Sequence, residues 1–490
     1  MTLINTRLGS VKGIEKNNVQ NFLGLPYAAA PVGNLRWKSA RPAPAWQGTF
    51  DATRYPNRCV QPPYPEDLIE GEIPGELSED CLYLNVHTPA ADDKKRPVVC
   101  WIHGGGLIQG SANEYDGSIL ARQQDCVVVA INYRLGIFGF CDFSALGEEY
   151  AGTISRGFED QITALRWIRD NIADYGGDPD CVSIWGESGG GGSVLALQGA
   201  PAAEGLFHSS IAFSPGDIEP GKMTPINAAK VLAEHLDITS DLESQLLDIP
   251  PADLFAHFQE VIVPLEQTAD KSKTVDGTII TRSPRDAIVS KGPDGPPLLS
   301  GTNKEEATYL KYLWGDEPGS SEFPKSIFVP LINQTDPQDY LAYLDRQTEG
   351  ATDVDKSEKI WNDCFRSAVL NNAEAATKAG AGGWVYNFEV PTDNPMGITH
   401  GCEIAFTFNM FELESCNLTA FHENTEENRA LAKLWGSVLV AFVRSASPNG
   451  EGLPVWPAYD AGNRSCLVFD RQPNVVSDPD GEDARKAYGC

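Results

Sequence analysis

The chain has 490 residues, of which 41% are hydrophobic and 22% are charged, so it can bury a sizeable core and global disorder is excluded. Lys and Arg number 38 against 68 Asp and Glu, which gives a formal net charge of −30 at pH 7. A surface this acidic repels phosphate groups and argues against nucleic acids and anionic membranes as partners, whereas a neutral or cationic ligand is accommodated more easily.

The N-terminus lacks the apolar segment of a secretory signal peptide, and no run of 18 apolar residues predicts a transmembrane helix. We therefore expect a cytoplasmic protein, with secretion as the alternative. The 11 cysteines form no CxxC pair, and no Cys/His cluster has zinc spacing, so the sequence predicts neither a metal site nor a cofactor.

The predicted elements begin with two short strands, at residues 11–14 and 22–26, around an Asn-Asn turn, which predict a small antiparallel sheet. Five continuous apolar runs follow and are typical of strands buried on both faces, as in a parallel sheet: 98–102, 126–131, 182–185, 297–299 and 384–388. Helical stripes at 160–172 and 426–443 alternate with them. This alternation predicts one doubly wound α/β domain over residues 1–490, with mostly helical insertions at about 217–296 and 302–380.

The most informative motif is Gly186-Glu187-Ser188-Gly189-Gly190, which matches G-x-S-x-G directly after the apolar run at 182–185 and before a helical stretch. A strand, a sharp turn and a helix are the context in which such a serine projects as a nucleophile. Without that context the motif would indicate only a surface glycine loop.

A second glycine motif, His103-Gly104-Gly105-Gly106, closes the run at 98–102. Tandem glycines expose backbone N–H groups that can bind the oxyanion of a tetrahedral intermediate. We expect Gly105 and Gly106 to supply two donors and Gly189 a third; by itself, the motif is equally consistent with a flexible turn.

A serine nucleophile needs a base, and the base needs an orienting acid, in the chain order Ser, acid, His for this architecture. His400 lies in a loop after the run at 384–388, where such a base is expected. The acid should follow the run at 297–299, where Glu305 and Glu306 compete and spacing alone does not choose between them.

Together these motifs resemble the type-B carboxylesterase/lipase family, which includes the cholinesterases, over nearly the whole chain. Residues 22–28 with 31–37 look like its N-terminal signature, and residues 79–86 look like its second signature. The family acid motif G-x-N-x-x-E-G aligns with residues 301–307 and selects Glu306, and the pattern G-x-x-H-x-x-E-I aligns with 397–404 and selects His400.

The resemblance implies the α/β-hydrolase fold: a mostly parallel central sheet flanked by helices, a small N-terminal antiparallel sheet and helical insertions over the active site. It implies a Ser188–His400–Glu306 triad with Gly105, Gly106 and Gly189 as the oxyanion hole. Family members join the cysteines aligned with Cys59 and Cys81, so we expect these two to lie close enough to bridge. Leu107 and Phe406 are candidates for lining the substrate pocket, and packing in the core is an equally good account of either.

The expected function is hydrolysis of small to medium neutral carboxylic esters through an acyl-enzyme, with no cofactor. Two alternatives stay open: acyl transfer, lactone or amide chemistry with the same triad, and a non-catalytic interaction protein on the same scaffold. Cholinesterases carry a Trp between the two aligned cysteines to bind the quaternary ammonium, and residues 60–80 contain no Trp, so the resemblance implies that choline esters are not preferred substrates. The family places the same segment near the mouth of the active-site gorge, and its seven acids, with no Lys or Arg, imply a bias against anionic acyl chains. The sequence does not determine the oligomeric state.

Overall fold

The computed structural model describes residues 1–16, 18–63, 73–216, 226–266, 275–308, 321–413, 421–450 and 452–490. The chain divides into two compact units. The first comprises Met1–Ile184, Ala196–Phe207 and Pro220–Arg282, and the second comprises Trp185–Leu195, His208–Glu219 and Ser283–Cys490. The single domain inferred from the sequence stays a prediction.

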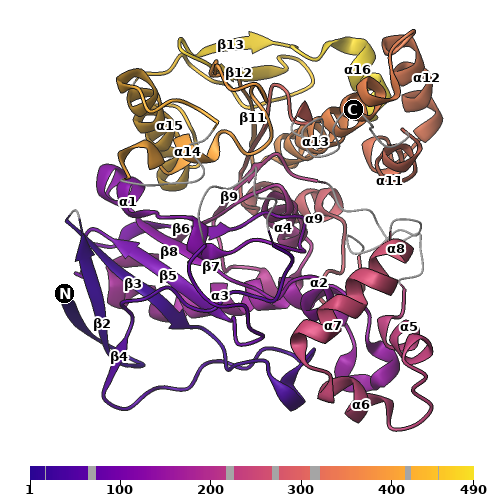
Figure 1. Ribbon diagram of the computed structural model, residues 1–490. Helices are drawn as coiled ribbons and strands as arrows, with labels where there is room; N and C mark the ends of the chain where they lie inside the picture. The colour runs from indigo at the N-terminus through magenta and orange to yellow at the C-terminus, as the bar shows by residue number, and fades with distance from the viewer. Residues whose placement is uncertain are drawn as a thin grey trace. The chain divides into compact units, whose positions relative to one another are not determined.

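The first unit contains the antiparallel beginning and the first parallel strands of the sheet (Figure 1). Its strand order is β1 (Thr2–Thr6), β2 (Gly9–Lys16), β3 (Val19–Pro26), β5 (Tyr83–Thr88), β7 (Val127–Ile131), β6 (Arg96–Ile102) and β8 (Gly177–Glu187), and β4 (Thr49–Asp51) pairs with β2. β2 and β3 pair antiparallel, which confirms the predicted N-terminal sheet, and β6 pairs parallel to β7. All residues of β6 and β7 are buried, as their continuous apolar runs predict.

The strand order of the second unit is β9 (Ser209–Phe213), β10 (Leu298–Asn303), β11 (Gly383–Phe388) and β12 (Ser465–Phe469), which are parallel, followed by the antiparallel β13 (Asn474–Ser477). β9 was not predicted, because two of its five residues are serines and its apolar run is too short to stand out. The hydroxyl of Ser210 donates to the carbonyl of Pro297, so this polar residue is satisfied inside the sheet.

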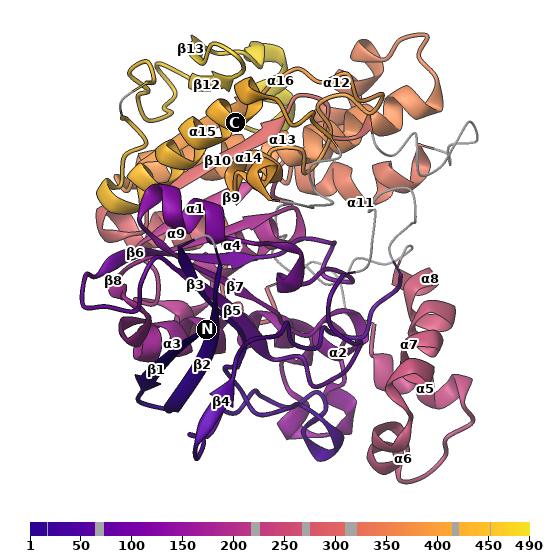
Figure 2. The same cartoon turned by 60° about the vertical axis from the view of Figure 1, so that its left-hand side comes forward.

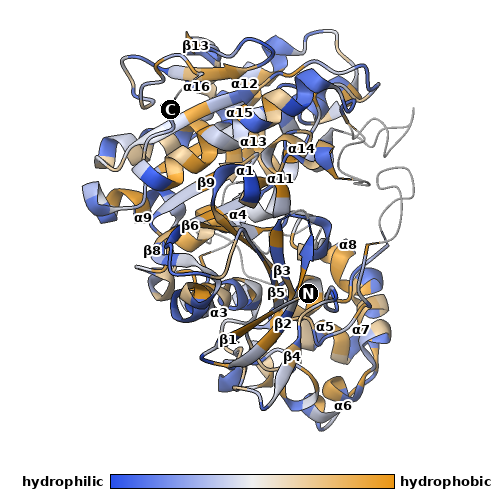
Figure 3. Cartoon of the chain, turned by 90° about the vertical axis from the view of Figure 1, so that its left-hand side faces the viewer, coloured by the Kyte–Doolittle hydropathy of each residue, from blue (hydrophilic) through white to orange (hydrophobic). Residues whose placement is uncertain are grey.

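The helices of the first unit include α1 (Ser118–Gln124), α2 (Gly136–Gly139) and α3 (Arg156–Asn171), which begins four residues before the predicted stripe. The first predicted insertion contains α5 (Ala228–His235), α6 (Leu242–Asp248), α7 (Pro251–His257), the π-helical turn η8 (Phe258–Ile262) and α8 (Val263–Glu266). Figure 2 shows these helices gathered in one group, and Figure 3 shows hydrophobic and hydrophilic residues mixed along them, as expected for helices with one buried face.

The second unit holds α9 (Pro284–Lys291), α11 (Glu322–Ile332), α12 (Pro337–Gln347), α13 (Asp353–Ala379), α14 (Ile404–Thr407), α15 (Glu426–Ser445) and α16 (Gly481–Tyr488). The long helix α13 begins at a capping box formed by Thr352 and Asp355, ends at Gly380 in the left-handed conformation, and packs on β10 and β11. Within the described ranges, none of the helices is both long and apolar enough to span a bilayer.

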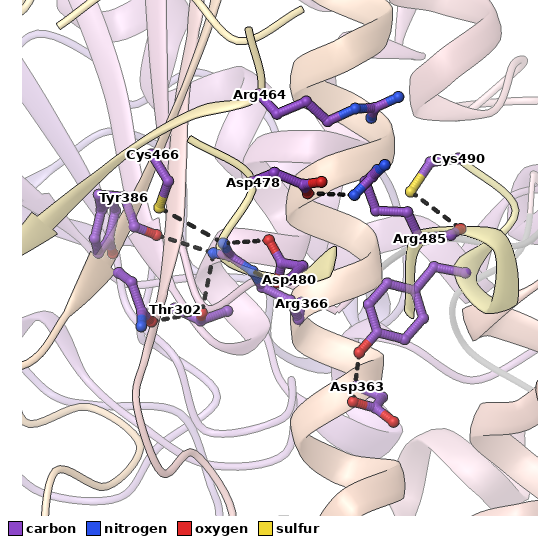
Figure 4. Close-up of polar contacts among 12 residues, drawn as sticks. Thr302, Asp363, Arg366, Tyr386, Arg464, Cys466, Asp478, Asp480, Arg485 and Cys490 are labelled. Atoms are coloured by element: carbon purple, nitrogen blue, oxygen red, sulfur yellow. Dashed lines mark hydrogen bonds and ion pairs between the residues drawn. The ribbon is translucent and has the colours of Figure 1, made fainter. Parts of the chain in front are cut away.

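A buried arginine ties α13 to the C-terminal part of the second unit (Figure 4). The guanidinium of Arg366 forms two hydrogen bonds with the carboxylate of Asp480, at 2.7 and 2.9 Å, and donates to the carbonyl of Tyr386. Arg485 pairs with Asp478 in the same region, and the hydroxyl of Tyr488 donates to Asp363. These contacts fix α13 against β11 and the segment that leads into α16.

Candidate active site

Ser188 lies at the turn between β8 and α4 (Gly189–Gln198), as the motif predicts. Its φ of 55° falls in the left-handed region, which is uncommon for a residue with a side chain and marks the strained turn of a nucleophile elbow. The amide of Ser188 donates to the carbonyl of Phe213 at 3.0 Å, and that of Gly192 donates to the carbonyl of Ser188. A methyl group on Gly191 would come within 2.6 Å of the Phe213 carbonyl, so this turn requires glycine.

His400 and Glu306 are in direct contact in the second unit. Nδ1 of His400 lies 2.5 Å from Oε2 of Glu306, and the backbone amide of His400 donates to the carbonyl of Glu306. Glu306 is almost fully buried, whereas His400 retains 12% of its side-chain exposure. Because the carboxylate accepts from Nδ1–H, the other ring nitrogen, Nε2, is the one available to exchange a proton.

The second oxygen of Glu306 accepts two further hydrogen bonds. The hydroxyl of Ser214 donates at 2.5 Å and the backbone amide of Asn303 donates at 2.6 Å. A carboxylate that accepts three hydrogen bonds is held in one orientation. Glu306 is therefore built to orient an imidazole and to stabilise its positive charge.

The neighbouring acid, Glu305, has a different task. Its carboxylate accepts from the backbone amide of Ile398 at 3.0 Å, and its own amide donates to the carbonyl of Ile398. Glu305 thus braces the loop that carries His400 without touching the ring. The spacing of the sequence left the choice between the two acids open, and the structure brings Glu306, the residue selected by the family motif, to His400.

Two more buried carboxylates surround His400. Oε1 of Glu187 lies 3.2 Å from Nε2 of His400, and Glu403 accepts a hydrogen bond from the side-chain amide of Asn303 at 2.6 Å. Burial raises the pKa of Glu187, and burial together with the charges of Glu187 and Glu306 raises the pKa of Glu403. Burial alone would lower the pKa of His400, but the charges of Glu187 and Glu306 outweigh it and raise that pKa to about 9.

The helix α13 supports this group from one side. The ring of Phe365 stacks on the imidazole of His400, with centroids 4.6 Å apart, and the side chain of Asn362 accepts from the backbone amide of Ala307, next to Glu306. The adjacent Arg366 is locked by Asp480 in the network of Figure 4. The orientation of His400 and Glu306 therefore depends on α13, which is itself held by the pair of Arg366 with Asp480.

The loop of the HGGG motif lies in the first unit and is held by buried contacts. His103 is buried and stacks on Tyr133, whose hydroxyl donates to the carbonyl of His103 at 2.7 Å. Gly105 and Gly106 have φ values of 90° and 63°, and a methyl group on Gly105 would come within 2.2 Å of the carbonyl oxygen of Gln109. Gly189 belongs to the second unit and begins α4, so its N–H has no acceptor within the helix. The oxyanion hole that these three glycines would form stays a prediction.

The remaining predicted residues are all buried. Cys59 and Cys81 are free thiols, and a hydrogen bond to Cys59 is the main cause that raises the pKa of Cys81. That these two cysteines lie close enough to form a disulfide stays a prediction, and the sequence leaves their oxidation state open. Phe406 packs edge-on against Phe388 and Phe411, so core packing accounts for it. Leu107 is 3% exposed with a φ of 66°. A pocket-lining role stays a prediction for both Leu107 and Phe406.

Sequence reasoning gave no role to Glu187 and Glu403, although both lie inside the aligned motifs, and it also missed Ser214, Asn303 and Phe365. Ser214 and Asn303 lie where β9 and β10 end, at the carboxyl edge of the parallel strands, where functional side chains gather. Recognising β9 as a strand would have been the signal for Ser214. Phe365 carried no signal, because it is one apolar residue among many on α13.

Proteins similar to this chain are named esterases. The model of the carboxylesterase family matches residues 1–486. The para-nitrobenzyl esterase of Bacillus subtilis is 32% identical over 99% of this chain and 98% of its own length, and carboxylesterase 1C of Rattus norvegicus is 34% identical over 90% of this chain and 83% of its own. The crystal structure of a Geobacillus stearothermophilus carboxylesterase superposes with a TM-score of 0.82 at 31% identity, covering 100% of both chains. The chain therefore belongs to the carboxylesterase family, has the α/β-hydrolase fold and is a carboxylic ester hydrolase.

Proposed function

We propose that this enzyme hydrolyses small to medium neutral carboxylic esters through a Ser188–His400–Glu306 triad. The observation that carries the proposal is the 2.5 Å contact between His400 and Glu306, whose carboxylate is held by Ser214 and Asn303. Ser188, at the strained turn after β8, supplies the nucleophile.

In this mechanism the hydroxyl of Ser188 attacks the ester carbonyl while Nε2 of His400 takes its proton. The resulting imidazolium is stabilised by Glu306, and the oxyanion is bound by backbone N–H groups of Gly105, Gly106 and Gly189. His400 then protonates the departing alcohol, which leaves an ester between Ser188 and the acyl group. Water, deprotonated by His400, attacks this acyl-enzyme and releases the carboxylic acid and free Ser188.

The position of Glu187 adds to this charge stabilisation. Its oxygen Oε1 lies 3.2 Å from Nε2 of His400 and has no hydrogen-bond partner among the described residues. A negative charge there favours the imidazolium that forms in the transition state. The same negative charge stabilises the protonated ring of His400 in the resting enzyme. His400 therefore loses this proton, and becomes able to act as a base, only at higher pH.

The first test replaces Ser188 by Ala and measures hydrolysis of a para-nitrobenzyl ester, the substrate named for the Bacillus subtilis relative. We expect kcat to fall by a factor on the order of 10⁶, as when a catalytic serine is removed from other triads. A fluorophosphonate should label the native enzyme at Ser188, located by mass spectrometry of peptides. The exposed Ser240→Ala is the matched control and should keep both activity and labelling. Retained activity in Ser188→Ala overturns the proposal.

A second pair of variants tests the acid. Glu306→Gln should lower kcat by about 10⁴, because an amide cannot hold the imidazole in the productive tautomer. Glu305→Gln makes the same chemical change at the next residue, whose carboxylate accepts from Ile398 and not from the ring. It should therefore lose far less activity. Equal losses in the two variants would contradict the assignment of Glu306.

A further inference from the structure

The helical insertion of the first unit holds a cluster of potential metal ligands that the proposed mechanism does not use. His235 is the last residue of α5, His257 is the last residue of α7, and Glu260 lies in the π-helical turn η8 that follows. One nitrogen of each imidazole and one carboxylate oxygen of Glu260 all lie within 4.8 Å of one another. Two helices that are separate in sequence therefore direct three ligand-type side chains at one point.

The distances are close to those that a bound ion requires. Nε2 of His235 lies 3.6 Å from Oε2 of Glu260, and the two imidazole rings are 5.2 Å apart between centroids. Ligands of a tetrahedral zinc ion, at bond lengths of about 2.1 Å, are separated by about 3.4 Å. Glu260 retains 67% and His235 retains 26% of their side-chain exposure, so rotation of these two side chains can close the remaining gap.

A second observation concerns His257 itself. Its Nδ1 is buried and has no hydrogen-bond partner among the described residues. Buried polar atoms are normally satisfied, and an orphaned one calls for a missing partner such as an ion or a water. The π-helical turn beginning at Phe258 points the same way, because the extra residue of such a turn is found frequently at functional sites.

We propose that His235, His257 and Glu260 bind a divalent transition-metal ion of the zinc type, with water completing its coordination. Two imidazoles and one carboxylate form a ligand set suited to Zn²⁺, and also to Co²⁺ or Ni²⁺, rather than to Ca²⁺ or Mg²⁺, which prefer oxygen. An ion pair between His235 and Glu260 alone would not explain why the adjacent His257 has a buried Nδ1 without a hydrogen-bond partner among the described residues. With a metal, both rings are neutral, and each donates a lone pair.

The ion would cross-link α5 to the α7–η8 segment and so stabilise the insertion. The effect extends to the next layer of the first unit, because the Phe258 ring lies against Gly136, where an added methyl group would come within 3.3 Å of it. The amide of Gly136 donates to the carbonyl of Leu107 at 2.8 Å, next to the glycines of the HGGG loop. Metal binding therefore restrains a turn that supports this loop.

The test is a titration of the full-length, tag-free and chelator-treated protein with Zn²⁺ by calorimetry and with Co²⁺ by visible absorption. We expect one equivalent to bind, with cobalt ligand-field bands and without the intense charge-transfer band that thiolate ligation produces. Zinc should also raise the midpoint of thermal unfolding, because it binds the folded state. No stoichiometric binding, or a spectrum dominated by thiolate, overturns the proposal.

The variants are chosen so that folding is preserved. Glu260→Gln changes an exposed side chain and should weaken the affinity for Zn²⁺ roughly tenfold or more. His235→Asn should weaken it further. Glu234→Gln, an exposed glutamate on the same helix, and His208→Asn, an exposed histidine elsewhere, are matched controls that should bind as the native protein does. An unchanged affinity in Glu260→Gln and His235→Asn contradicts the site.

Discussion

At the scale of single residues, the most unusual feature is the charge around His400. Three buried carboxylates, Glu187, Glu306 and Glu403, raise the pKa of this histidine to about 9 against the lowering effect of burial. Glu306 contacts Nδ1, whereas Glu187 faces Nε2, the nitrogen that must accept the proton of Ser188. Glu306 and Glu187 thus strengthen His400 as a base from the two nitrogens of its ring, and Glu403 adds to the effect.

This arrangement predicts the pH dependence of the Glu187→Gln variant. The neutral ring is the active base, so kcat/KM of the native enzyme should rise with pH through a pKa above the usual histidine value of about 6.5. Removing the negative charge of Glu187 lowers the pKa of His400 and moves the rising limb to lower pH. The measurement is kcat/KM for a neutral aryl ester across the pH range in both proteins. An unmoved limb would mean that Glu187 does not control the base.

At the scale of elements, α13 links the stability of the second unit to the geometry of its site. Along this helix Asn362 and Phe365 contact the residues around Glu306 and His400, while Arg366 is paired with Asp480. A buried arginine that is fully hydrogen-bonded is tolerated, but removing its partner leaves an uncompensated charge. We therefore expect a change at Asp480, which lies outside α13, to destabilise this helix by leaving the buried charge of Arg366 without its partner.

The corresponding prediction concerns the free energy of unfolding. Asp480→Asn should lower it by about 3 kcal/mol, because the side chains of Arg366 and Asp480 are only 10% and 13% exposed. Glu482→Gln removes the same charge two residues later from a surface pair with Lys486 and should leave stability unchanged. Urea unfolding followed by circular dichroism measures both. Equal destabilisation of the two variants would show that burial of the Arg366 pair is not the cause.

At the scale of the whole molecule, the acids that make up the net charge of −30 do not all contribute to the surface potential. Among the seven acids of residues 60–80, Glu79 forms a buried double hydrogen bond with Arg36, so it adds nothing to the surface potential. Glu76 is exposed and Asp80 is half-buried. The other four acids, Glu66, Asp67, Glu70 and Glu72, lie outside the described residues. The expected bias against anionic substrates therefore rests on fewer charges of this segment than the sequence suggested.

That bias predicts how salt affects two matched substrates. For an aryl ester with a carboxylate on its acyl chain, kcat/KM should rise with ionic strength, because salt screens the repulsion between the acidic protein and the substrate. For the neutral ester of similar size, it should not change. Initial rates at about 0.01 M and about 1 M salt compare Debye lengths of about 30 Å and 3 Å. Parallel responses of the two esters would contradict an electrostatic origin.

The sequence by itself was enough to predict the strands and helices that have long apolar patterns. It was also enough to locate the residues of the two glycine motifs. Ser188 lies at the predicted turn after β8, and the N-terminal strands pair as expected, because periodicity and glycine placement act locally. Short elements with weak apolar patterns were not predicted from the sequence. The strand β9, which contains two serines, could be recognised only from its pairing in the sheet.

The tertiary structure alone decided which side chains meet. Spacing does not separate Glu305 from Glu306, and only the family motif favoured Glu306; the path of the loop after β10 brings Glu306 to His400 and Glu305 to Ile398. Ser214 and Phe365 contact Glu306 and His400 from segments that no local sequence pattern connects to them. The same is true of the cluster formed by His235, His257 and Glu260. The physical reason is that sequence patterns report which face of an element is buried, whereas a site depends on distances between elements, and packing of the folded chain sets those distances.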